Sequence, residues 1–433
     1  MLQTSCSTIR VGLLGFGVVG SGVVKVLQKN SAEIEKRVGR KIELAAIADL
    51  DLKSDRGVKV DKKILTTDGF AVCADPQIDI IVETVGGTGI AAKFIETALS
   101  HGKHVVTANK ALLSEKGEPL FALAEKQGKL LLFEAAVGGA IPIVRTLKTD
   151  LASEKIEKIF GILNGTCNFI LTKLANEGGE FAEVLADAQQ RGFAEADPTL
   201  DIEGGDTAHK IALLASIAFG AKIDFSKIHI EGITKLSAAD FEFARRLNRK
   251  IKLIAIAKKE NGEIEIRVNP TLLPIDSPLA KIDGVTNAIA VHGQNLGQII
   301  LSGPGAGSLP TATAVVGDII EAARGSQIPS RGMPEKLLQK FPIKKIDAIE
   351  SEFYLRFAVK DVAGVIRDIS NVLAKYELSI RDILQLDLNE FKREVPLVIL
   401  LHKNSELRVR KAVEEINQLK CVNGKTVVLR VEE

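Results

Sequence analysis

Cysteine and histidine are scarce and scattered in this sequence. The cysteines are Cys6, Cys73, Cys167 and Cys421, with no Cys-x-x-Cys spacing, and the six histidines include no His-Glu-x-x-His pattern. This distribution argues against a disulfide framework and against a structural zinc site. We therefore expect the cysteines to be small apolar residues.

Long hydrophobic runs and an excess of charge of one sign are also missing. Apolar stretches such as Ile211 to Phe219 are far shorter than the ~20 residues that cross a bilayer, and the N-terminus has no basic flank before an apolar core. Lys and Arg total 57 against 55 Asp and Glu, without a dense basic run. Nucleic acid and membranes are not expected partners, and a cytoplasmic location is expected.

The sequence is long enough for several domains. At roughly 100 to 200 residues per domain, 433 residues correspond to about two to four domains. A hydrophobic fraction of 46% with 37 glycines is typical of globular α/β packing.

The first 140 residues alternate between strand-like and helix-like segments. The run from Thr8 to Leu14 is apolar, residues 15–20 read GFGVVG, and a helical pattern opens at Val23. Further strands are expected at 42–48, 78–83, 104–107 and 130–133, and helices at 90–100 and 119–127. This alternation predicts a parallel, doubly wound sheet, so we assign residues 1–140 to a dinucleotide-binding domain of Rossmann type.

A different pattern begins at residue 141. Helical stretches at 168–175, 181–190 and 207–219 precede strand-like runs at 251–258, 264–268, 286–291 and 298–301. This predicts an α+β domain over residues 141–323, whose last helix, 311–323, is expected to pack on the nucleotide domain. Residues 324–349 are rich in Pro, Gly, Lys and Arg and are interpreted as a linker.

Residues 350–433 follow the order strand, helix, strand, strand, helix, strand. The expected elements are 352–359, 365–374, 379–387, 395–401, 408–416 and 425–431. This βαββαβ order predicts a compact ferredoxin-like domain.

The glycine loop of the first domain is a candidate cofactor site. In Gly15-x-Gly17-x-x-Gly20 the first glycine permits a tight turn, the second lets a pyrophosphate approach the backbone, and the third lets helix and strand pack closely. N–H groups at the helix start then bind the phosphates. The second strand ends at Asp49, which either accepts hydrogen bonds from the adenosine ribose or is a solvated strand end. The predicted loop is completed by Phe16, Val18 and Val19.

Two polar segments each follow an apolar strand, at the sheet edge where ligands bind in this architecture. One begins Glu83-Thr84-Val85, and the other reads Thr107-Ala108-Asn109-Lys110. From the residues alone, ligand binding by Thr84 and Thr107 and simple capping of the next helix are equally supported.

The densest group of ionisable residues lies between positions 192 and 210. It contains five carboxylates, one histidine and Lys210. If a helix opens at Gly205 or Asp206, then Asp206 and Lys210 lie one turn apart on one face, where the carboxylate can orient the ammonium. A solvated surface is the usual alternative, but the apolar run after Lys210 places this group at the mouth of a core helix.

Taken together, these segments resemble homoserine dehydrogenase over essentially the whole chain. The family's signature is matched by Ala188 through Gly192, Asp197-Pro198, Asp201, Gly204, Asp206 and Lys210. Other blocks of the family resemble TANK at 107–110, EAAVGGAIP at 134–142 and NGTCNFIL at 164–171. The segment Lys360-Asp-Val-Ala-Gly364-Val-Ile is similar to part of an ACT domain.

The resemblance implies NAD(P)-linked interconversion of L-homoserine and L-aspartate 4-semialdehyde, at the branch to threonine, methionine and isoleucine. It implies that Lys210 is the acid/base group, that Lys110 is its companion, and that Asp206 positions the lysine. Residues 141–323 are then the catalytic, substrate-binding and dimerisation domain.

The resemblance also implies ligand contacts. Glu195 and Asp201 are expected to hold the substrate's ammonium group, and Gly165 and Thr166 to contact the substrate. Beyond the glycine loop and Asp49, the implied cofactor contacts are Thr84, Val85, Thr107, Asn109, Lys110 and Gly307. A structural Na⁺ or K⁺ is expected on the backbone carbonyls of Glu134, Val137, Gly139 and Ile141.

Lysine chemistry suits this reaction. Oxidising a primary alcohol requires a base for the hydroxyl proton while hydride leaves for the nicotinamide. A free lysine has a pKa of about 10.4, and burial or a second ammonium group lowers lysine pKa values. In reduction, the same ammonium donates a proton to the developing alkoxide.

Two positions depart from the family's pattern. Phe193 stands where many members have an aromatic hydroxyl, and Leu50 stands where many have an arginine that suits an NADP phosphate. Lys53 and Arg56 could substitute, but the aspartates on either side of Leu50 would oppose a 2′-phosphate. These residues favour NAD over NADP, and comparable turnover with both cofactors also fits the sequence.

Two other functions fit parts of the sequence. An acylating semialdehyde dehydrogenase would use Cys167 as nucleophile, but no activating base is evident for it. A nucleotide-binding regulatory protein would sense an amino acid without catalysis, but the two lysines and the acidic residues argue against it.

The resemblance of residues 350–433 to an ACT domain implies either of two roles. One is feedback inhibition by threonine bound near Asp361 to Gly364, and the other is oligomerisation alone. Coupled domains of this kind favour symmetric assemblies, so a homodimer or homotetramer is expected.

Overall fold

The computed structural model describes residues 8–385 and 394–432, which fall into two compact units. Unit 1 consists of Met1–Ile159, His209–Ser226 and Ile289–Phe341, and unit 2 of Phe160–Ala208, Lys227–Ala288 and Pro342–Glu433. Cys6 and the end of the strand predicted at 379–387 lie outside the described residues. Within the described ranges, no helix has both the length and the apolar character needed to cross a membrane.

Unit 1 contains a six-stranded sheet in the order β3-β2-β1-β4-β5-β6, and every neighbouring pair is parallel. The direction of winding changes between β1 and β4, so the loops after these strands leave the sheet at the position where dinucleotides bind. This confirms the predicted doubly wound sheet. The strands are β1 (Ile9–Leu14), β2 (Ile42–Ala48), β3 (Leu65–Thr66), β4 (Ile80–Glu83), β5 (His104–Thr107) and β6 (Leu131–Leu132).

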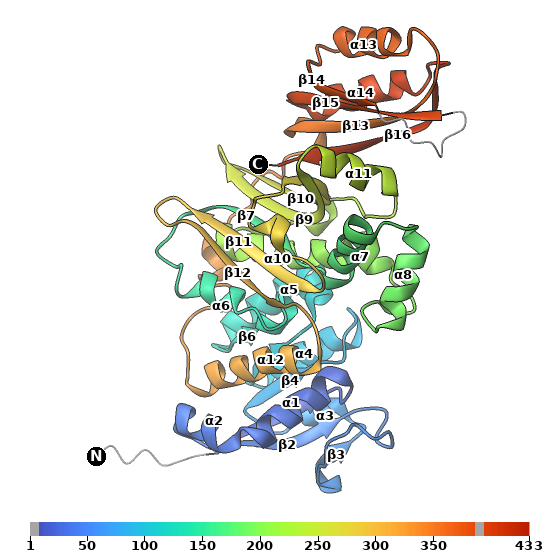
Figure 1. Ribbon diagram of the computed structural model, residues 1–433. Helices are drawn as coiled ribbons and strands as arrows, with labels where there is room; N and C mark the ends of the chain where they lie inside the picture. Colours follow the sequence, from blue (N-terminus) through green and yellow to red (C-terminus); the bar gives the residue numbers. More distant parts are fainter. Residues whose placement is uncertain (1–7, 386–393, 433) are drawn as a thin grey trace. The chain divides into compact units, whose positions relative to one another are not determined.

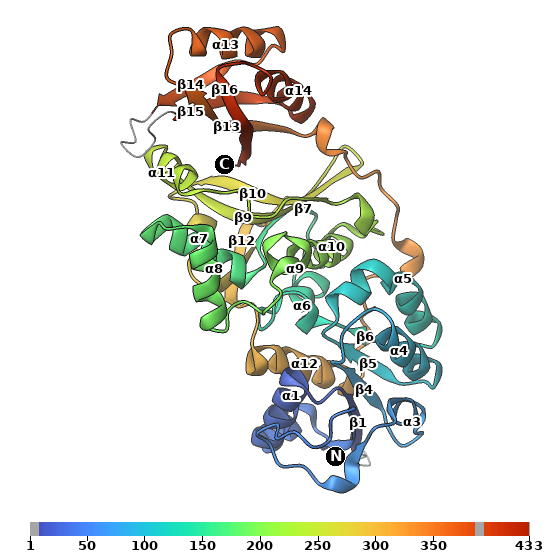
Figure 2. The ribbon, with the colours of Figure 1, turned by 90° about the vertical axis from the view of Figure 1, so that its right-hand side faces the viewer.

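Helices cover both faces of this sheet, with α1 and α12 side by side on one face and α3, α4 and α5 on the other (Figure 2). Close packing of α1 on α12 requires Gly22, because a Cβ there would lie 2.7 Å from the Ser308 hydroxyl. The helices of unit 1 are α1 (Val18–Lys29), α2 (Ser31–Val38), α3 (Gly69–Ala74), α4 (Ile90–Ser100), α5 (Lys110–Lys126), α6 (Ile143–Lys148) and α12 (Ser308–Ala323).

Helix α5 begins nine residues before the predicted start at Pro119, so that prediction is wrong. The Asn109 side chain caps the helix by accepting a hydrogen bond from Leu112 N at 3.1 Å. Pro119 therefore lies inside the helix. Proline is commonest in the first turn of helices, so its position inside α5 is a poor guide to where this helix begins.

Unit 2 is built around the antiparallel hairpin of β9 and β10, which pairs twelve residues on each strand. The helices near it are α7 (Gly165–Glu177), α8 (Phe181–Gln190), α9 (Thr199–Ile202) and α11 (Ala238–Arg246), and its strands are β8 (His229–Ile230), β9 (Arg249–Glu260) and β10 (Glu263–Pro274). Three elements have residues in both units: β7 (Ile156–Ile162), α10 (Gly205–Phe219) and β11 (Thr286–Gly293). Strand β12 (Gly297–Pro304) belongs to unit 1.

The C-terminal part of unit 2, residues 350–432, has the predicted βαββαβ order and is called here the C-terminal module. Its strands run in the order β16-β13-β15-β14, with all pairs antiparallel, and α13 and α14 cover one face (Figure 1). The elements are β13 (Glu350–Lys360), α13 (Val365–Lys375), β14 (Ile380–Gln385), β15 (Glu394–Ser405), α14 (Glu406–Ile416) and β16 (Val422–Val431).

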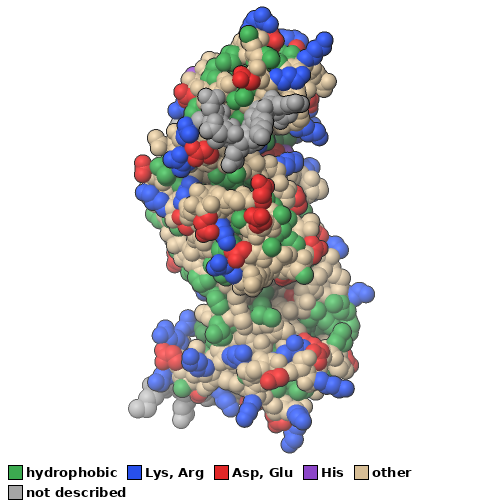
Figure 3. All heavy atoms as spheres, turned by 45° about the vertical axis from the view of Figure 1, so that its right-hand side comes forward, with side chains coloured by type: hydrophobic (Ala, Val, Ile, Leu, Met, Phe, Trp, Pro, Cys, Tyr) green, Lys and Arg blue, Asp and Glu red, His purple; other side chains and the backbone are tan. Residues whose placement is uncertain are grey.

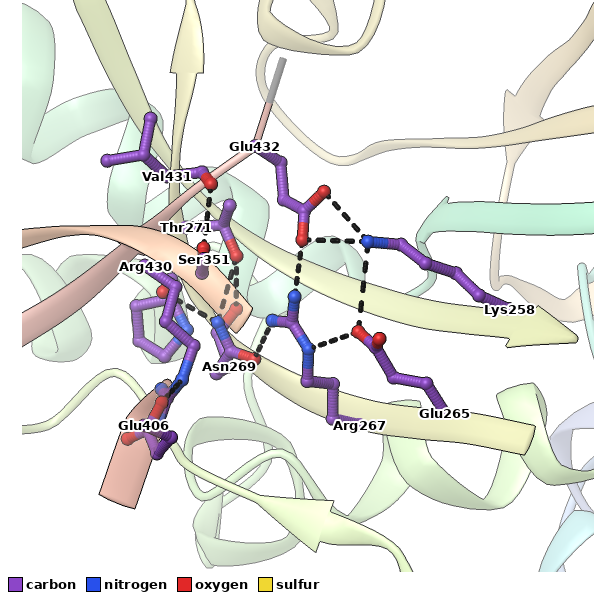
Figure 4. Close-up of polar contacts among 11 residues, drawn as sticks. Lys258, Glu265, Arg267, Asn269, Thr271, Ser351, Glu406, Arg430, Val431 and Glu432 are labelled. Atoms are coloured by element: carbon purple, nitrogen blue, oxygen red, sulfur yellow. Dashed lines mark hydrogen bonds and ion pairs between the residues drawn. The ribbon is translucent and has the colours of Figure 1, made fainter. Parts of the chain in front are cut away.

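The last strand of the C-terminal module also extends the sheet of the β9–β10 hairpin. Strand β16 pairs in parallel with β10, with Thr271 opposite Arg430, and Glu432 N donates to Leu272 O at 3.1 Å. Figure 4 shows the charged side chains at this junction, where the Glu432 carboxylate accepts from Arg267 and Lys258. The sequence did not predict this strand pairing, which makes the module a continuation of the hairpin sheet.

The segment predicted as a linker is irregular but packed. Its residues up to 341 belong to unit 1 and the rest to unit 2. Arg331 is only 3% exposed, donates to Glu118 and Glu335, and lies 4.5 Å from the Phe121 ring centre. This arginine therefore anchors the segment to α5.

Candidate functional site

The glycine loop of unit 1 connects β1 to α1 and has the form of a phosphate-binding turn. Gly15 has φ +91°, and a Cβ there would lie 2.9 Å from the Thr84 carbonyl, while a Cβ on Gly20 would lie 2.0 Å from Gly15 O. Both positions therefore require glycine. A Cβ on Gly17 would meet no atom within 4 Å, so this backbone is open to an approaching group. These three environments fit the roles predicted for a dinucleotide site.

Asp49 lies against this loop rather than standing as an isolated strand end. Its carboxylate accepts a hydrogen bond from Phe16 N and another, at 2.8 Å, from Asp51 N. Arg56 lies 3.0 Å from the Asp51 carboxylate and 3.9 Å from that of Asp49. Hydrogen bonds from Ser54 and Lys53, together with Arg56, lower the pKa of Asp51 to about 2. The guanidinium of Arg56 is therefore engaged by two carboxylates.

Glu83, at the end of β4, organises the loops around the cofactor edge, and sequence reasoning assigned it no role. Its side chain is fully buried, and Oε1 accepts from Val85 N at 2.8 Å and from Gly86 N at 2.9 Å. The other oxygen accepts from the Thr107 hydroxyl. The sequence did carry a signal for this role, namely an acid at the end of an apolar strand. A carboxylate that is buried there needs several hydrogen-bond donors from the surrounding loops.

The two threonines are not helix caps. The Thr84 hydroxyl contacts Leu14 O at 3.1 Å and Gly15 O at 3.0 Å, which ties the loop after β4 to the glycine turn. Thr107 accepts from Asn109 N at 3.0 Å, and Asn109 donates to Gly87 O at 2.7 Å while capping α5. The loops after β1, β4 and β5 thus form one hydrogen-bonded edge.

Gly307 and the predicted cation loop also lie in unit 1. Gly307, with φ +116°, is the residue before α12, and the Ser308 hydroxyl donates to Val18 O at 2.7 Å at the start of α1.

In the predicted cation loop, Gly139 has φ +60°, and a Cβ there would lie 2.5 Å from the Gly305 carbonyl. Burial raises the pKa of Glu134, although Val144 N and Arg145 N donate to its carboxylate. The four residues predicted to face a cation, Glu134, Val137, Gly139 and Ile141, are all buried.

The two lysines belong to unit 1 and lie on neighbouring helices. Lys110 is the first residue of α5, and Lys210 lies on α10 with 8% exposure. His209 Nε2 lies 3.0 Å from the Glu115 carboxylate, which joins the two helices one residue from Lys210. The predicted helix start is confirmed, since α10 begins at Gly205 and Asp206 is one turn before Lys210.

Within unit 2, Asp206, which was predicted to position the lysine, lies with the predicted substrate residues Asp201 and Thr166 at the start of α7. Asn164 Nδ2 donates to Asp201 Oδ1 at 2.7 Å and to Asp206 Oδ2 at 2.9 Å. The Thr166 hydroxyl donates to Phe193 O and lies 3.3 Å from Asp201 Oδ2. Sequence reasoning assigned no role to Asn164, although an asparagine directly before a helix is a capping signal.

The remaining candidates of this segment have different surroundings. A Cβ on Gly165 would lie 2.8 Å from Val285 O, so glycine lets the backbone just before β11 approach the start of α7. Glu195 and Phe193 are exposed, and the Phe193 ring lies 5.0 Å from that of Phe169. The Cys167 thiol is fully buried and donates to Asp201 O at 3.2 Å, the environment of a packed residue.

Known proteins similar to this chain fall in one family. A family model described as "Homoserine dehydrogenase" matches residues 142–320, and one described as "Homoserine dehydrogenase, NAD binding domain" matches residues 15–134. The homoserine dehydrogenase of Neisseria gonorrhoeae is 41% identical over 430 residues, with 98% of each chain covered.

Two solved structures extend the comparison. The homoserine dehydrogenase of Thiobacillus denitrificans superposes with a TM-score of 0.93 at 40% identity, with 99% of each chain covered. A hyperthermophilic archaeal homoserine dehydrogenase in complex with NADPH has a TM-score of 0.63 at 27% identity, covering 74% of this chain and 99% of its own. The chain therefore belongs to the homoserine dehydrogenase family and catalyses the NAD(P)-dependent interconversion of L-homoserine and L-aspartate 4-semialdehyde.

Proposed function

We propose that the amine of Lys210 moves the hydroxyl proton of homoserine, positioned by Asp206 and accompanied by Lys110. The observation that carries this proposal is the His209–Glu115 hydrogen bond of 3.0 Å, which joins the two lysine-bearing helices beside a nearly buried Lys210. The nicotinamide, when bound, accepts the hydride. In the reverse direction the Lys210 ammonium donates its proton to the alkoxide oxygen.

The carboxylates of Asp201 and Glu195 bind the substrate's ammonium group in this proposal, and Gly165 and Thr166 contact the same substrate. Support comes from the hydrogen bonds that hold Asp201 at the start of α7 and from the exposure of Glu195. Phe193 offers no hydroxyl, so its ring contributes only apolar contact at the substrate.

Carboxylate-to-amide variants test this assignment. Asp201→Asn and Glu195→Gln should each raise KM for homoserine about tenfold or more, because each removes a charge-assisted hydrogen bond. Glu183→Gln is the matched control, since this exposed acid lies on α8 outside the signature residues. An unchanged KM in Asp201→Asn would exclude Asp201 from the ammonium site.

For the cofactor, we propose binding on Gly15 to Gly20, Asp49 and the loops after β4 and β5, with NAD preferred over NADP. Asp49 and Asp51 oppose a 2′-phosphate, and both lie near the guanidinium of Arg56, the nearest candidate to bind it. Asp51→Asn should therefore raise the ratio of kcat/KM for NADP to that for NAD, because it removes one negative charge and weakens the hold on Arg56. A ratio that stays at the wild-type value would contradict this explanation of cofactor choice.

We also propose a structural Na⁺ or K⁺ on the backbone carbonyls of Glu134, Val137, Gly139 and Ile141. The buried, irregular loop and the left-handed Gly139 support it, since such a loop can turn carbonyl oxygens toward a hard cation. Replacing NaCl or KCl by tetramethylammonium chloride at equal ionic strength should lower the melting temperature. Equal melting temperatures in all three salts would contradict the site.

The C-terminal module is proposed to bind threonine near Asp361 to Gly364 and to inhibit the enzyme, within a homodimer or homotetramer. Gly364, with φ +97°, starts α13 there. Titration with threonine should inhibit the wild type, and Asp361→Ala should weaken this inhibition without changing the uninhibited rate. If threonine has no effect on the wild type, the proposed role of the module is assembly alone. Light scattering of the full chain measures the size of that assembly.

A further inference from the structure

Two carboxylates of unit 2, those of Asp201 and Asp206, meet at the side chain of Asn164. This asparagine stands directly before α7 and is 6% exposed. Its Oδ1 accepts from Cys167 N at 2.8 Å, and its Nδ2 donates to Asp201 Oδ1 at 2.7 Å and to Asp206 Oδ2 at 2.9 Å. One side chain thus caps a helix and contacts two carboxylates from different elements.

Helix capping alone does not explain the choice of asparagine. Serine, threonine and aspartate also accept a hydrogen bond at the N-cap. Only asparagine adds an amide with two N–H donors on a side chain of this length. The Cys167 N–H fixes which end of the amide is the oxygen, so the NH₂ group must face the carboxylates.

The two N–H bonds also fix a geometry. They diverge by about 120° in a planar amide, so two oxygens bound to one nitrogen are held about 5 Å apart. A neutral donor has a further advantage over lysine at this position. It leaves the negative charge of Asp201 available to the ammonium group of a substrate, whereas a lysine would neutralise it.

We propose that Asn164 is a positioning residue of the dehydrogenase reaction. It holds Asp201, at the substrate's ammonium end, in a fixed relation to Asp206, which orients the Lys210 amine one turn later on α10. This inference rests on the roles proposed above for Asp201, Asp206 and Lys210. Asn164 acts through these carboxylates and does not itself touch the reacting atoms.

Two variants separate positioning from capping. Asn164→Ser keeps an acceptor for Cys167 N but cannot reach both carboxylates, and Asn164→Asp keeps the cap while adding a third negative charge. We expect Asn164→Ser to lower kcat/KM for homoserine about ten- to hundredfold while melting close to the wild type. In Asn164→Asp the loss should be larger, and the acidic limb of the kcat/KM profile should move to higher pH, because neighbouring carboxylates raise each other's pKa.

A control variant removes a cap elsewhere. Asp68 caps α3 by accepting from Ala71 N at 2.9 Å, so Asp68→Ala should lower the melting temperature without changing KM for homoserine. Asn164→Ala should show both effects, since it loses the cap and the bridge. Kinetic defects at Asn164 that only follow the melting temperature would overturn the proposal.

Asp201→Asn and Asp206→Asn complete the test. Wild-type kinetics in Asn164→Ser, with both aspartate variants impaired, would reject the positioning role and leave the proposed function intact. Wild-type kinetics in all three variants would reject the proposed roles of the acids as well. Impaired kinetics in all three, with a folded Asn164→Ser and the shifted profile of Asn164→Asp, supports positioning.

Discussion

Glu432, at the end of β16, offers the sharpest test of how the C-terminal module is held to the β10 strand. Its carboxylate accepts from Arg267, whose side chain is fully buried, and from Lys258 at 3.0 Å (Figure 4). Removing one partner of a buried ion pair costs about 3–5 kcal/mol, because the other charge stays buried. Arg267 retains Glu265 at 2.9 Å, so we expect Glu432→Ala to cost roughly 2–3 kcal/mol.

Glu414→Ala is the matched control for this variant. Glu414 pairs with Arg410 one turn away on α14, at 3.1 Å, with side chains 62% and 49% exposed. Such an exposed pair contributes at most about 0.5 kcal/mol. Urea unfolding of both variants, followed by circular dichroism, measures the difference. A Glu432→Ala loss no greater than that of Glu414→Ala would refute the claim that this buried cluster holds β16 on β10.

Two further predictions concern acid stability and the glycine loop. Although burial opposes it, hydrogen bonds from His229 and Arg430 lower the pKa of Glu231 to about 2, so its stabilisation is present above an unfolded-state pKa near 4.5 and is lost as the pH falls toward 2. Glu231→Gln should therefore lose stability less steeply than the wild type across that window in acid titrations of unfolding, and parallel curves would contradict it. Gly20→Ala should lower the melting temperature and raise KM for the cofactor, whereas Gly17→Ala should raise KM with little change in melting, because a Cβ on Gly17 meets no protein atom. Equal melting losses in both glycine variants would contradict this distinction.

The parts of the fold that could be predicted are those that a local sequence pattern marks. Strand β2 and helix α4 match their predicted bounds. Strand β2 is a short apolar run, and the apolar residues of α4 recur at helical spacing. The pairing of β16 with β10 could not be predicted, since it joins segments far apart in the sequence through two residue pairs. No local pattern encodes such a contact.

The candidate site shows the same division. The glycine loop and the Asp206 to Lys210 spacing are local, and the structure places them on the expected turn and helix. Glu83 and Asn164 act through hydrogen bonds to distant segments, so their contacts with Thr107 and with Asp201 emerge only in the fold. Asn164 did carry a local signal as a helix cap, but a cap predicts one of its three hydrogen bonds.

Charges of both signs are mixed among the described residues on the face that Figure 3 draws. Figure 3 shows Lys and Arg side chains interspersed with Asp and Glu across it. This distribution agrees with the balanced composition of 57 basic and 55 acidic residues.

The most direct test of the account is homoserine oxidation by Lys210→Ala with NAD and with NADP, beside the wild type and Lys126→Ala. Lys126 is an exposed lysine in the last turn of α5 and controls for loss of a surface charge. We predict that Lys210→Ala stays folded and loses at least about a hundredfold in kcat with both cofactors, the lower range for a general base, while Lys126→Ala keeps the wild-type rate. Turnover by Lys210→Ala at the wild-type rate would contradict the proposal that this amine moves the proton.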